Sequence, residues 1–181
     1  MRKIITLSLV TLTALPAFSV TVVNKTISEE EVLNAQKSWC SALVNISETN
    51  RKEGVEKAKK LAESVIDEAY AYDMGAVLFK PTLTMNPQTF RTTKDGALSY
   101  FVGGNSKYPK DKGFALKDWT KCIPENSAIL ISGDTATTMG KVHFINKDGK
   151  ETTVDKTWQF LKDDKGKLRI VLHHSSLEYT E

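Results

Sequence analysis

The stretch KTWQFLKDDKGKLRIVLHHSS, residues 156–176, decides the fold because its pattern is that of a β-hairpin. Apolar and polar side chains alternate on both sides of DDKGK, as they do in paired strands with one buried face. Gly166 suits the left-handed position in the loop between the two strands. This loop pairs Phe160 with Ile170 and thereby fixes which side chains of the hairpin share a face.

The register of this hairpin predicts which of its polar side chains are buried. Successive residues of a strand point to opposite faces, so Lys156, Trp158 and His174 share the apolar face. His173 then faces solvent. Two adjacent histidines on a regular strand cannot bind one metal ion, and we expect no metal site. Ser176 and His174 lie roughly 6.5 Å apart along a strand, which is too far for a nucleophile and its base.

The rest of the chain has a helical first half and a stranded second half. Ser28 and Glu31 have the spacing of a capping box, which predicts the start of a long helix. A second helix has a buried stripe from Val55 to Tyr72, and Gly75 is expected to end it. The other predicted elements are an extended segment at 76–84, a short helix within 92–104, and strands at 119–126, 128–132, 135–145, 152–161 and 167–174. We therefore expect one α+β domain, with helices packed on one face of an antiparallel sheet of at least four strands.

The N-terminal residues 1–19 have the pattern of a signal peptide. Arg2 and Lys3 precede a short apolar run, and ALPAFS ends it with the small residues that a signal peptidase prefers. We expect a single mature domain, residues 20–181, in the periplasm or secreted, with no membrane attachment after cleavage. The alternative is an N-terminal anchor that stays uncleaved.

The mature chain carries almost no net charge. Removal of Arg2 and Lys3, and of no acidic residue, lowers the formal charge from +3 to +1. Nucleic-acid binding requires a basic surface, so we expect no nucleic-acid partner.

The chain contains two cysteines, Cys40 and Cys122. Their number and an oxidising compartment permit one disulfide. The alternative is two free thiols buried as small apolar side chains. The spacing alone leaves both possibilities open, because bridge geometry cannot be derived from it.

The closing hairpin also resembles that of the nuclear transport factor 2-like superfamily, also called cystatin-like or SnoaL-like. PTLT (81–84), TTKDGALSYF (92–101) and SGDTATTMGKVHF (132–144) resemble further parts of that domain, in particular in the association domain of calcium/calmodulin-dependent protein kinase II. The resemblance implies a cone, in which a bent antiparallel sheet wraps a long N-terminal helix and leaves a pocket between them. Arginines line this pocket in the kinase domain, and their positions correspond here to His143 and Trp158.

The position of His143 depends on one turn. If Asp148 and Gly149 form a two-residue turn, His143 joins the face of Lys156 and Trp158. A three-residue loop that begins at Lys147 would turn His143 outward. We favour the two-residue turn.

The predicted pocket combines the apolar face of the hairpin with neighbouring segments. Its candidate ligand-binding residues are His143, Lys156, Trp158 and His174, with Arg91 and Tyr100 near the mouth. Each has a plainer role as an alternative: a hydrogen-bonded core histidine, core packing, or a surface side chain.

Two functions are compatible with such a pocket. The first is an exported domain that binds a small molecule or a partner, forms a homodimer through its sheet and needs no cofactor. The alternative is an isomerase, dehydratase or cyclase of the SnoaL or ketosteroid isomerase kind, with His143 or His174 as general base. We favour the binding domain, because no acid–base pair can be placed in the pocket: Asp73 and Asp155 are the nearest carboxylates, and Asp155 points outward.

Overall fold

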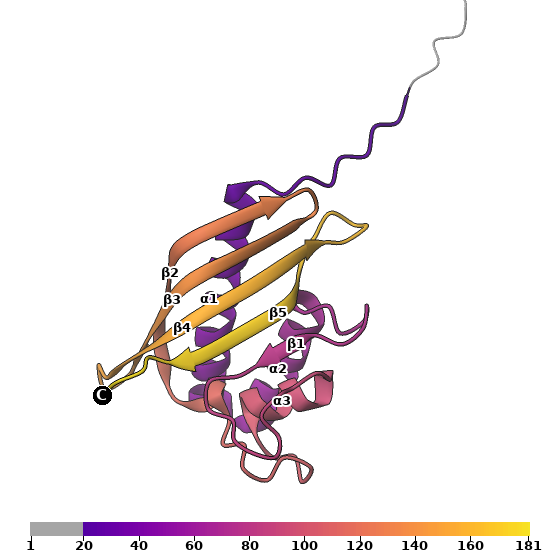
Figure 1. Cartoon of the computed structure of the whole chain (residues 1–181). Helices are drawn as coiled ribbons and strands as arrows, with labels where there is room; N and C mark the ends of the chain where they lie inside the picture. The colour runs from indigo at the N-terminus through magenta and orange to yellow at the C-terminus, as the bar shows by residue number, and fades with distance from the viewer. Residues whose placement is uncertain (1–19) are drawn as a thin grey trace, which may run out of the picture.

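The computed structural model describes residues 20–181, and the predicted signal peptide lies outside them. Helices pack on one face of a five-stranded sheet with the strand order β1-β5-β4-β3-β2 (Figure 1). The helices are α1 (Glu29–Glu53), α2 (Val55–Ala69) and α3 (Lys94–Val102), with a short 3-10 helix, η1, at Phe114–Leu116. The strands are β1 (Leu78–Lys80), β2 (Trp119–Ser132), β3 (Thr135–Asn146), β4 (Glu151–Lys162) and β5 (Leu168–Leu177). This arrangement confirms the predicted α+β class.

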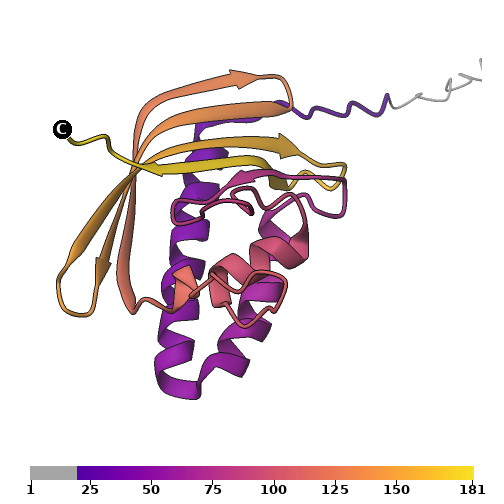
Figure 2. The same cartoon turned by 60° about the horizontal axis from the view of Figure 1, so that its bottom comes forward.

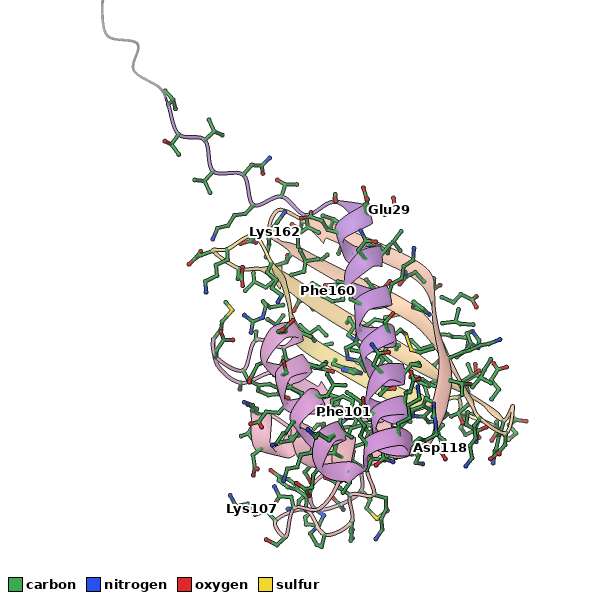
Figure 3. The ribbon with its side chains drawn as sticks, turned by 180° about the vertical axis from the view of Figure 1, so that it is seen from behind. Glu29, Phe101, Lys107, Asp118, Phe160 and Lys162 are labelled. Carbon is green, nitrogen blue, oxygen red and sulfur yellow. A yellow bond between two sulfur atoms is a disulfide. The ribbon has the colours of Figure 1, made fainter. Side chains whose placement is uncertain are left out.

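The long helix α1 lies across the inner face of the sheet, which bends around it (Figure 2 and Figure 3). It starts as predicted, because Ser28 caps it and the side chain of Glu31 returns a bond to the cap. A disulfide between Cys40 and Cys122 joins the middle of α1 to β2, with the two Cα atoms 5.1 Å apart. In residues 20–181, no helix is long and apolar enough to cross a membrane.

Helix α2 ends earlier than the sequence predicts. Its last residue is Ala69, and Gly75 lies beyond it in a loop. Tyr70 adopts an extended conformation instead and forms an isolated parallel bridge with Ile170 of β5. This bridge draws the Tyr70 side chain into the core, where it is almost fully buried.

The sheet is mixed rather than wholly antiparallel. The four long strands β2 to β5 pair antiparallel, as predicted. The short strand β1 runs parallel to β5 and pairs Phe79 with His173 and Lys80 with His174. The segment before Pro81 therefore forms the edge of the sheet, beside the closing strand of the domain.

The β4–β5 hairpin has the predicted pairing at one end only. Phe160 pairs with Ile170, as expected, but the next residue, Gln159, pairs with Leu172. Val171 is thus an extra residue in β5, a β-bulge, and the alternation of β5 is reversed beyond it. The prediction that places His174 inside and His173 in solvent is wrong for this reason.

The β3–β4 turn also differs from the prediction. Lys147, Asp148 and Gly149 form a three-residue loop, closed by the bond from the Asn146 N–H to the carbonyl of Lys150. Gly149 takes the positive φ of 77° that such a loop needs. The predicted two-residue turn is therefore wrong, and the three-residue loop turns His143 outward.

Candidate functional site

A buried pair of basic side chains lies at the centre of the inner face. His173 of β5 is 2% exposed, and Lys156 of β4 is 5% exposed. The Nζ of Lys156 lies 2.8 Å from the Nε2 of His173. No carboxylate among residues 20–181 acts on the pKa of either side chain. A lysine and a histidine that share a hydrogen bond in the core in this way are an unusual arrangement for packing alone.

A chain of hydrogen bonds continues from the other ring nitrogen of His173. Its Nδ1 lies 2.8 Å from the hydroxyl of Tyr70. The indole N–H of Trp39 donates to the same hydroxyl at 2.9 Å. Both nitrogens of the imidazole therefore have partners within the protein, and α1, the α2 terminus, β4 and β5 each contribute one residue to the chain.

Burial controls the protonation of this pair. Desolvation, and then the nearby charge of Lys80, lowers the pKa of Lys156 from its ordinary 10.5 to about 7. Desolvation and the charge of Lys156 lower the pKa of His173 well below its ordinary value. Burial raises the pKa of Tyr70 well above its ordinary value. Near neutral pH, His173 and Tyr70 are uncharged and Lys156 is poised between its two forms.

Aromatic rings surround the amine of Lys156. Its Nζ lies 5.1 Å from the ring centre of Trp39, 5.4 Å from that of Trp158 and 5.8 Å from that of Phe144. Faces of such rings stabilise a cation, which partly offsets the desolvation of the ammonium form. The site can therefore hold both forms of the amine.

A small cavity adjoins the pair. Its lining residues are Trp39, Phe79, Pro81, Thr82, Tyr100, Phe101, Phe114, Lys156, His173 and Ser175. Its volume of ≈ 10 Å³ is close to what a single water-sized molecule needs. Thr82 is the one lining residue that is only half-buried, so the cavity is nearest to solvent at the segment after β1.

Three hydroxyl groups contribute to the polar side of this cavity. The Oγ1 of Thr82 lies 2.5 Å from the Oγ of Ser175. Lys80 donates to the backbone carbonyl of Ser175 at 2.9 Å and so holds β1 and β5 together beside them. Burial raises the pKa of Tyr100, while hydrogen bonding to Leu83 and Thr82 acts in the opposite direction.

The structure brings together three of the six predicted site residues. Lys156 and Tyr100 line the cavity, and Trp158 packs against both Lys156 and His173. The indole N–H of Trp158 has no hydrogen-bond partner in the part of the chain that the structure describes. These three positions agree with the predicted pocket, although their role as ligand-binding residues stays a prediction.

The two histidines predicted for the pocket lie outside it. His174 is exposed on the outer face of the sheet, because of the bulge at Val171. His143 also faces outward, where it contacts Glu125, Glu151 and the hydroxyl of Thr153. The carboxylates raise the pKa of His143, Glu151 more than Glu125.

Arg91 is buried but is not part of the cavity. It forms an ion pair of 2.8 Å with Asp111, and its guanidinium lies 4.6 Å from the ring centre of Tyr108. Its carbonyl accepts a hydrogen bond from the hydroxyl of Tyr72. These contacts hold the loops at 85–92 and 105–113 together, so Arg91 is a structural residue rather than a surface one.

The site contains residues that the sequence patterns assigned to the core or to loops. Trp39 and Tyr70 lie on or near apolar helical stripes, which is where core residues also lie. Thr82 belongs to PTLT, and His173 and Ser175 belong to HHSS. Both short motifs can be recognised in the sequence, but the sequence does not show that they lie together in one cavity. Among residues 20–181, no group of three or more histidine, cysteine, aspartate or glutamate side chains could hold a metal ion.

Comparison with solved structures places the fold in a known class. A protein from Xanthomonas campestris, described as a calcium/calmodulin-dependent protein kinase II association domain, has a TM-score of 0.55. At 20% identity over 93% of this chain and all of that one, it shows the shared fold alone. Together with the bent sheet and its helices, it confirms the predicted nuclear transport factor 2-like fold.

Comparison with protein families is more specific. Residues 30–177 match the family of metal-independent carbonic anhydrases, so the chain belongs to that family. The chain was predicted to be most similar to the kinase association domain, and this finer assignment is wrong, whereas the nuclear transport factor 2-like fold is confirmed.

Two relatives support this assignment at high identity. A metal-independent carbonic anhydrase from Nostoc sp. is 59% identical over 170 residues, which cover 94% of this chain and 83% of the relative. The crystal structure of a cyanobacterial iota-carbonic anhydrase complexed with bicarbonate has a TM-score of 0.88 and 60% identity. That comparison covers 91% of this chain and all of the other.

Proposed function

We propose that the chain is a carbonic anhydrase that interconverts carbon dioxide and bicarbonate in the cavity beside Lys156 and His173. The observation that carries this proposal is the combination of a buried basic pair with hydroxyl groups around a space of ≈ 10 Å³. Membership of the metal-independent carbonic anhydrase family supports it. So does the relative of known structure, which is complexed with bicarbonate.

The walls of the cavity suit the two forms of the substrate. Carbon dioxide is small and apolar, and the aromatic rings of Trp39, Phe79 and Phe101 provide an apolar wall. Bicarbonate is an anion whose oxygens accept hydrogen bonds. The hydroxyls of Thr82 and Ser175 lie 2.5 Å apart, and a hydroxyl can rotate to donate a hydrogen bond to an oxygen in the cavity.

The hydration step moves charge in a way that these groups can stabilise. Water adds to the carbon of carbon dioxide, one oxygen of carbon dioxide becomes negative, and one proton leaves the water. Donors placed beside that oxygen in a site without bulk water stabilise the transition state strongly. A basic nitrogen beside the same space can accept the proton.

The isomerase, dehydratase or cyclase alternative fits this site less well. Substrates of those enzymes have several carbons or fused rings, so the small cavity would have to widen far more for them than for carbon dioxide or bicarbonate. The two histidines proposed as general bases for it, His143 and His174, lie on the outer face. No observation in the site favours this alternative.

Stopped-flow measurement of carbon dioxide hydration with a pH indicator tests the proposal. We expect Ser175→Ala and Thr82→Val each to lower kcat/KM by about 10²–10³-fold, as the loss of one transition-state donor does. His174→Ala is the matched control on the same strand and should keep the wild-type rate. Prior treatment with a chelator should also leave the rate unchanged.

Two results would contradict the proposal. The first is wild-type protein that does not accelerate hydration above the buffer rate. The second is full activity in both hydroxyl variants, which would place the reaction elsewhere in the molecule.

We also propose that the mature domain acts outside the cytoplasm. The disulfide between Cys40 and Cys122 supports this location, because such bonds persist mainly in oxidising compartments. Carbon dioxide and bicarbonate would then be exchanged in the periplasm or the medium.

A further inference from the structure

The cavity has two basic nitrogens along its wall. They differ in how many of their hydrogen-bonding positions are already used by other groups of the protein. These are the Nε2 of His173 and the Nζ of Lys156. His173 shares a hydrogen bond with Tyr70 through Nδ1 and with Lys156 through Nε2. An imidazole has two ring nitrogens, so both are already used. Among the described residues, no carboxylate lines the cavity.

Lys156 differs because its nitrogen has positions to spare. A lysine nitrogen has four tetrahedral positions, one of which is bonded to carbon. Within residues 20–181, its one hydrogen bond is the contact with His173. Two positions of the nitrogen therefore remain for a molecule in the cavity.

We propose that Lys156, rather than His173, is the base that accepts the proton from water in the hydration step. This inference rests on the proposed carbonic anhydrase function. As the oxygen of water bonds to the carbon of carbon dioxide, one O–H bond breaks and its proton goes to the lone pair of Nζ. A C=O electron pair moves to oxygen and completes bicarbonate. The ammonium then passes its proton to a buffer base in solvent.

This role requires one particular arrangement of protons in the chain behind Lys156. The lone pair of Nζ must face the cavity, so the amine has to donate one N–H to the Nε2 of His173. The imidazole then carries its own proton on Nδ1 and donates it to the hydroxyl oxygen of Tyr70. That oxygen has two lone pairs, and Trp39 donates to the second. Tyr70 and His173 are thus positioning residues for the lysine.

The surroundings of Lys156 suit a base that works at neutral pH. The titratable groups that face it are His173 of β5, Lys80 of β1 and the phenol of Tyr100 on α3, with Tyr70 behind His173. His174 lies on the opposite face of β5. None of them is a carboxylate that would hold the ammonium form. A base whose pKa lies close to the working pH transfers protons most effectively.

This arrangement predicts opposite pH profiles for the two directions. The hydration rate should rise with pH through a midpoint near the lysine pKa of about 7 and then level off. The dehydration of bicarbonate needs the ammonium form of Lys156 as the acid. Its rate should therefore fall over the same range of pH.

Three variants test the proposal by stopped-flow hydration kinetics between about pH 6 and 9. Lys156→Met keeps the length and apolar character of the side chain, and should lower kcat/KM by about 10²–10⁴-fold at every pH. Tyr70→Phe keeps the ring but removes the acceptor of the Nδ1 proton. The imidazole proton should then move to Nε2, block the lone pair of Lys156 and slow hydration by about tenfold or more. Tyr72→Phe is the matched control, because its hydroxyl bonds the carbonyl of Arg91, away from the cavity.

Nuclear magnetic resonance of the wild-type protein gives an independent readout. With labelled lysine, Lys156 should titrate near neutral pH rather than near 10.5. With labelled histidine, His173 should be neutral with its proton on Nδ1, and Tyr70→Phe should move that proton to Nε2. A structural role alone would not change the histidine tautomer together with the rate.

The outcomes separate this inference from the proposed function. If wild-type protein does not hydrate carbon dioxide, the function itself is overturned, and the base role with it. If wild-type protein is active and Lys156→Met retains most of its kcat/KM, only the base role is overturned. The same holds if Lys156 stays an ammonium up to about pH 9, or if His173 of the active protein carries its proton on Nε2.

Discussion

Replacing Lys156 with Met should stabilise the protein, and more so at low pH. The side chain is buried and its pKa is lowered from 10.5 to about 7, so the folded state binds the proton less tightly than the unfolded state. The unfolded chain therefore holds more protons than the folded one between these two pH values. Stability of the wild type rises with pH over that range, and the penalty is largest below about pH 7. Methionine has no such penalty.

The size of the effect follows from the two pKa values. Their difference of about 3.5 units corresponds to about 5 kcal/mol, which is the full penalty at low pH. At pH 9 the unfolded state is still protonated, and about 2 kcal/mol of the penalty remains. The advantage of Lys156→Met over wild type should thus shrink by about 2.5 kcal/mol between pH 6 and pH 9. The lost hydrogen bond to His173 costs about 1–3 kcal/mol at every pH and cancels in that difference.

Urea denaturation of both proteins at a series of pH values measures this difference directly. His173 stays neutral in the folded state of both proteins because its pKa is lowered mainly by desolvation. It protonates only in the unfolded chain, so the slope that it adds at low pH is the same in both proteins and cancels in the difference. Lys165→Met, at an exposed position in the β4–β5 loop, is the control and should run parallel to wild type. Parallel curves for wild type and Lys156→Met would show that the lysine is charged in the folded state, and would refute the reasoning.

Four further predictions concern the fold and the whole chain. Replacing Cys40 and Cys122 together by Ala should lower the free energy of unfolding by about 4 kcal/mol in urea denaturation, since the disulfide spans a separation of 82 residues; an unchanged midpoint would contradict this. Gly140→Ala should cost about 2 kcal/mol or more, because a Cβ there would overlap the backbone of β2, and thermal unfolding would detect it. Light scattering should show a homodimer that forms through the outer face of the sheet, and Met139→Lys on that face should yield monomers. N-terminal sequencing of protein exported from cells should begin at Val20; an intact Met1 would argue against export.

The sequence patterns predicted the elements of the fold well and two registers poorly. The capping box at Ser28, the hairpin loop at Gly166 and the pairing of Phe160 with Ile170 depend on residues within a few positions of one another. Nearby residues therefore determine these three features. The β3–β4 turn cannot be predicted in the same way, because Asp148-Gly149 fits a two-residue turn as well as the end of a three-residue loop.

The site was predictable only in part, because its contacts join distant segments. Lys156 and Trp158 follow from the alternation of β4, which is regular. Trp39 and Tyr70 fall on apolar helical spacing, and that spacing cannot distinguish a packed ring from one that also donates a hydrogen bond. The end of α2 at Ala69 depends on the bridge between Tyr70 and Ile170, which are about a hundred residues apart in the sequence. Helix propensity near Ala69 cannot predict such a contact.

The bulge at Val171 connects the fold to the chemistry. In a regular β5 the side chains that follow Ile170 on the inner face would be those of Leu172 and His174. The extra residue replaces them by His173 and Ser175, which bring a ring nitrogen and a hydroxyl to the cavity.

The same strand position also anchors Tyr70. Ile170, the last residue before the bulge, pairs with Phe160 on one side and with Tyr70 on the other. The Tyr70 hydroxyl is thereby held 2.8 Å from the Nδ1 of His173, the side chain that the bulge turns inward. Bulges occur often beside active sites, where they re-aim a side chain. Here the bulge makes the prediction from alternation wrong, and it also places His173 between Tyr70 and Lys156 in the hydrogen-bond chain.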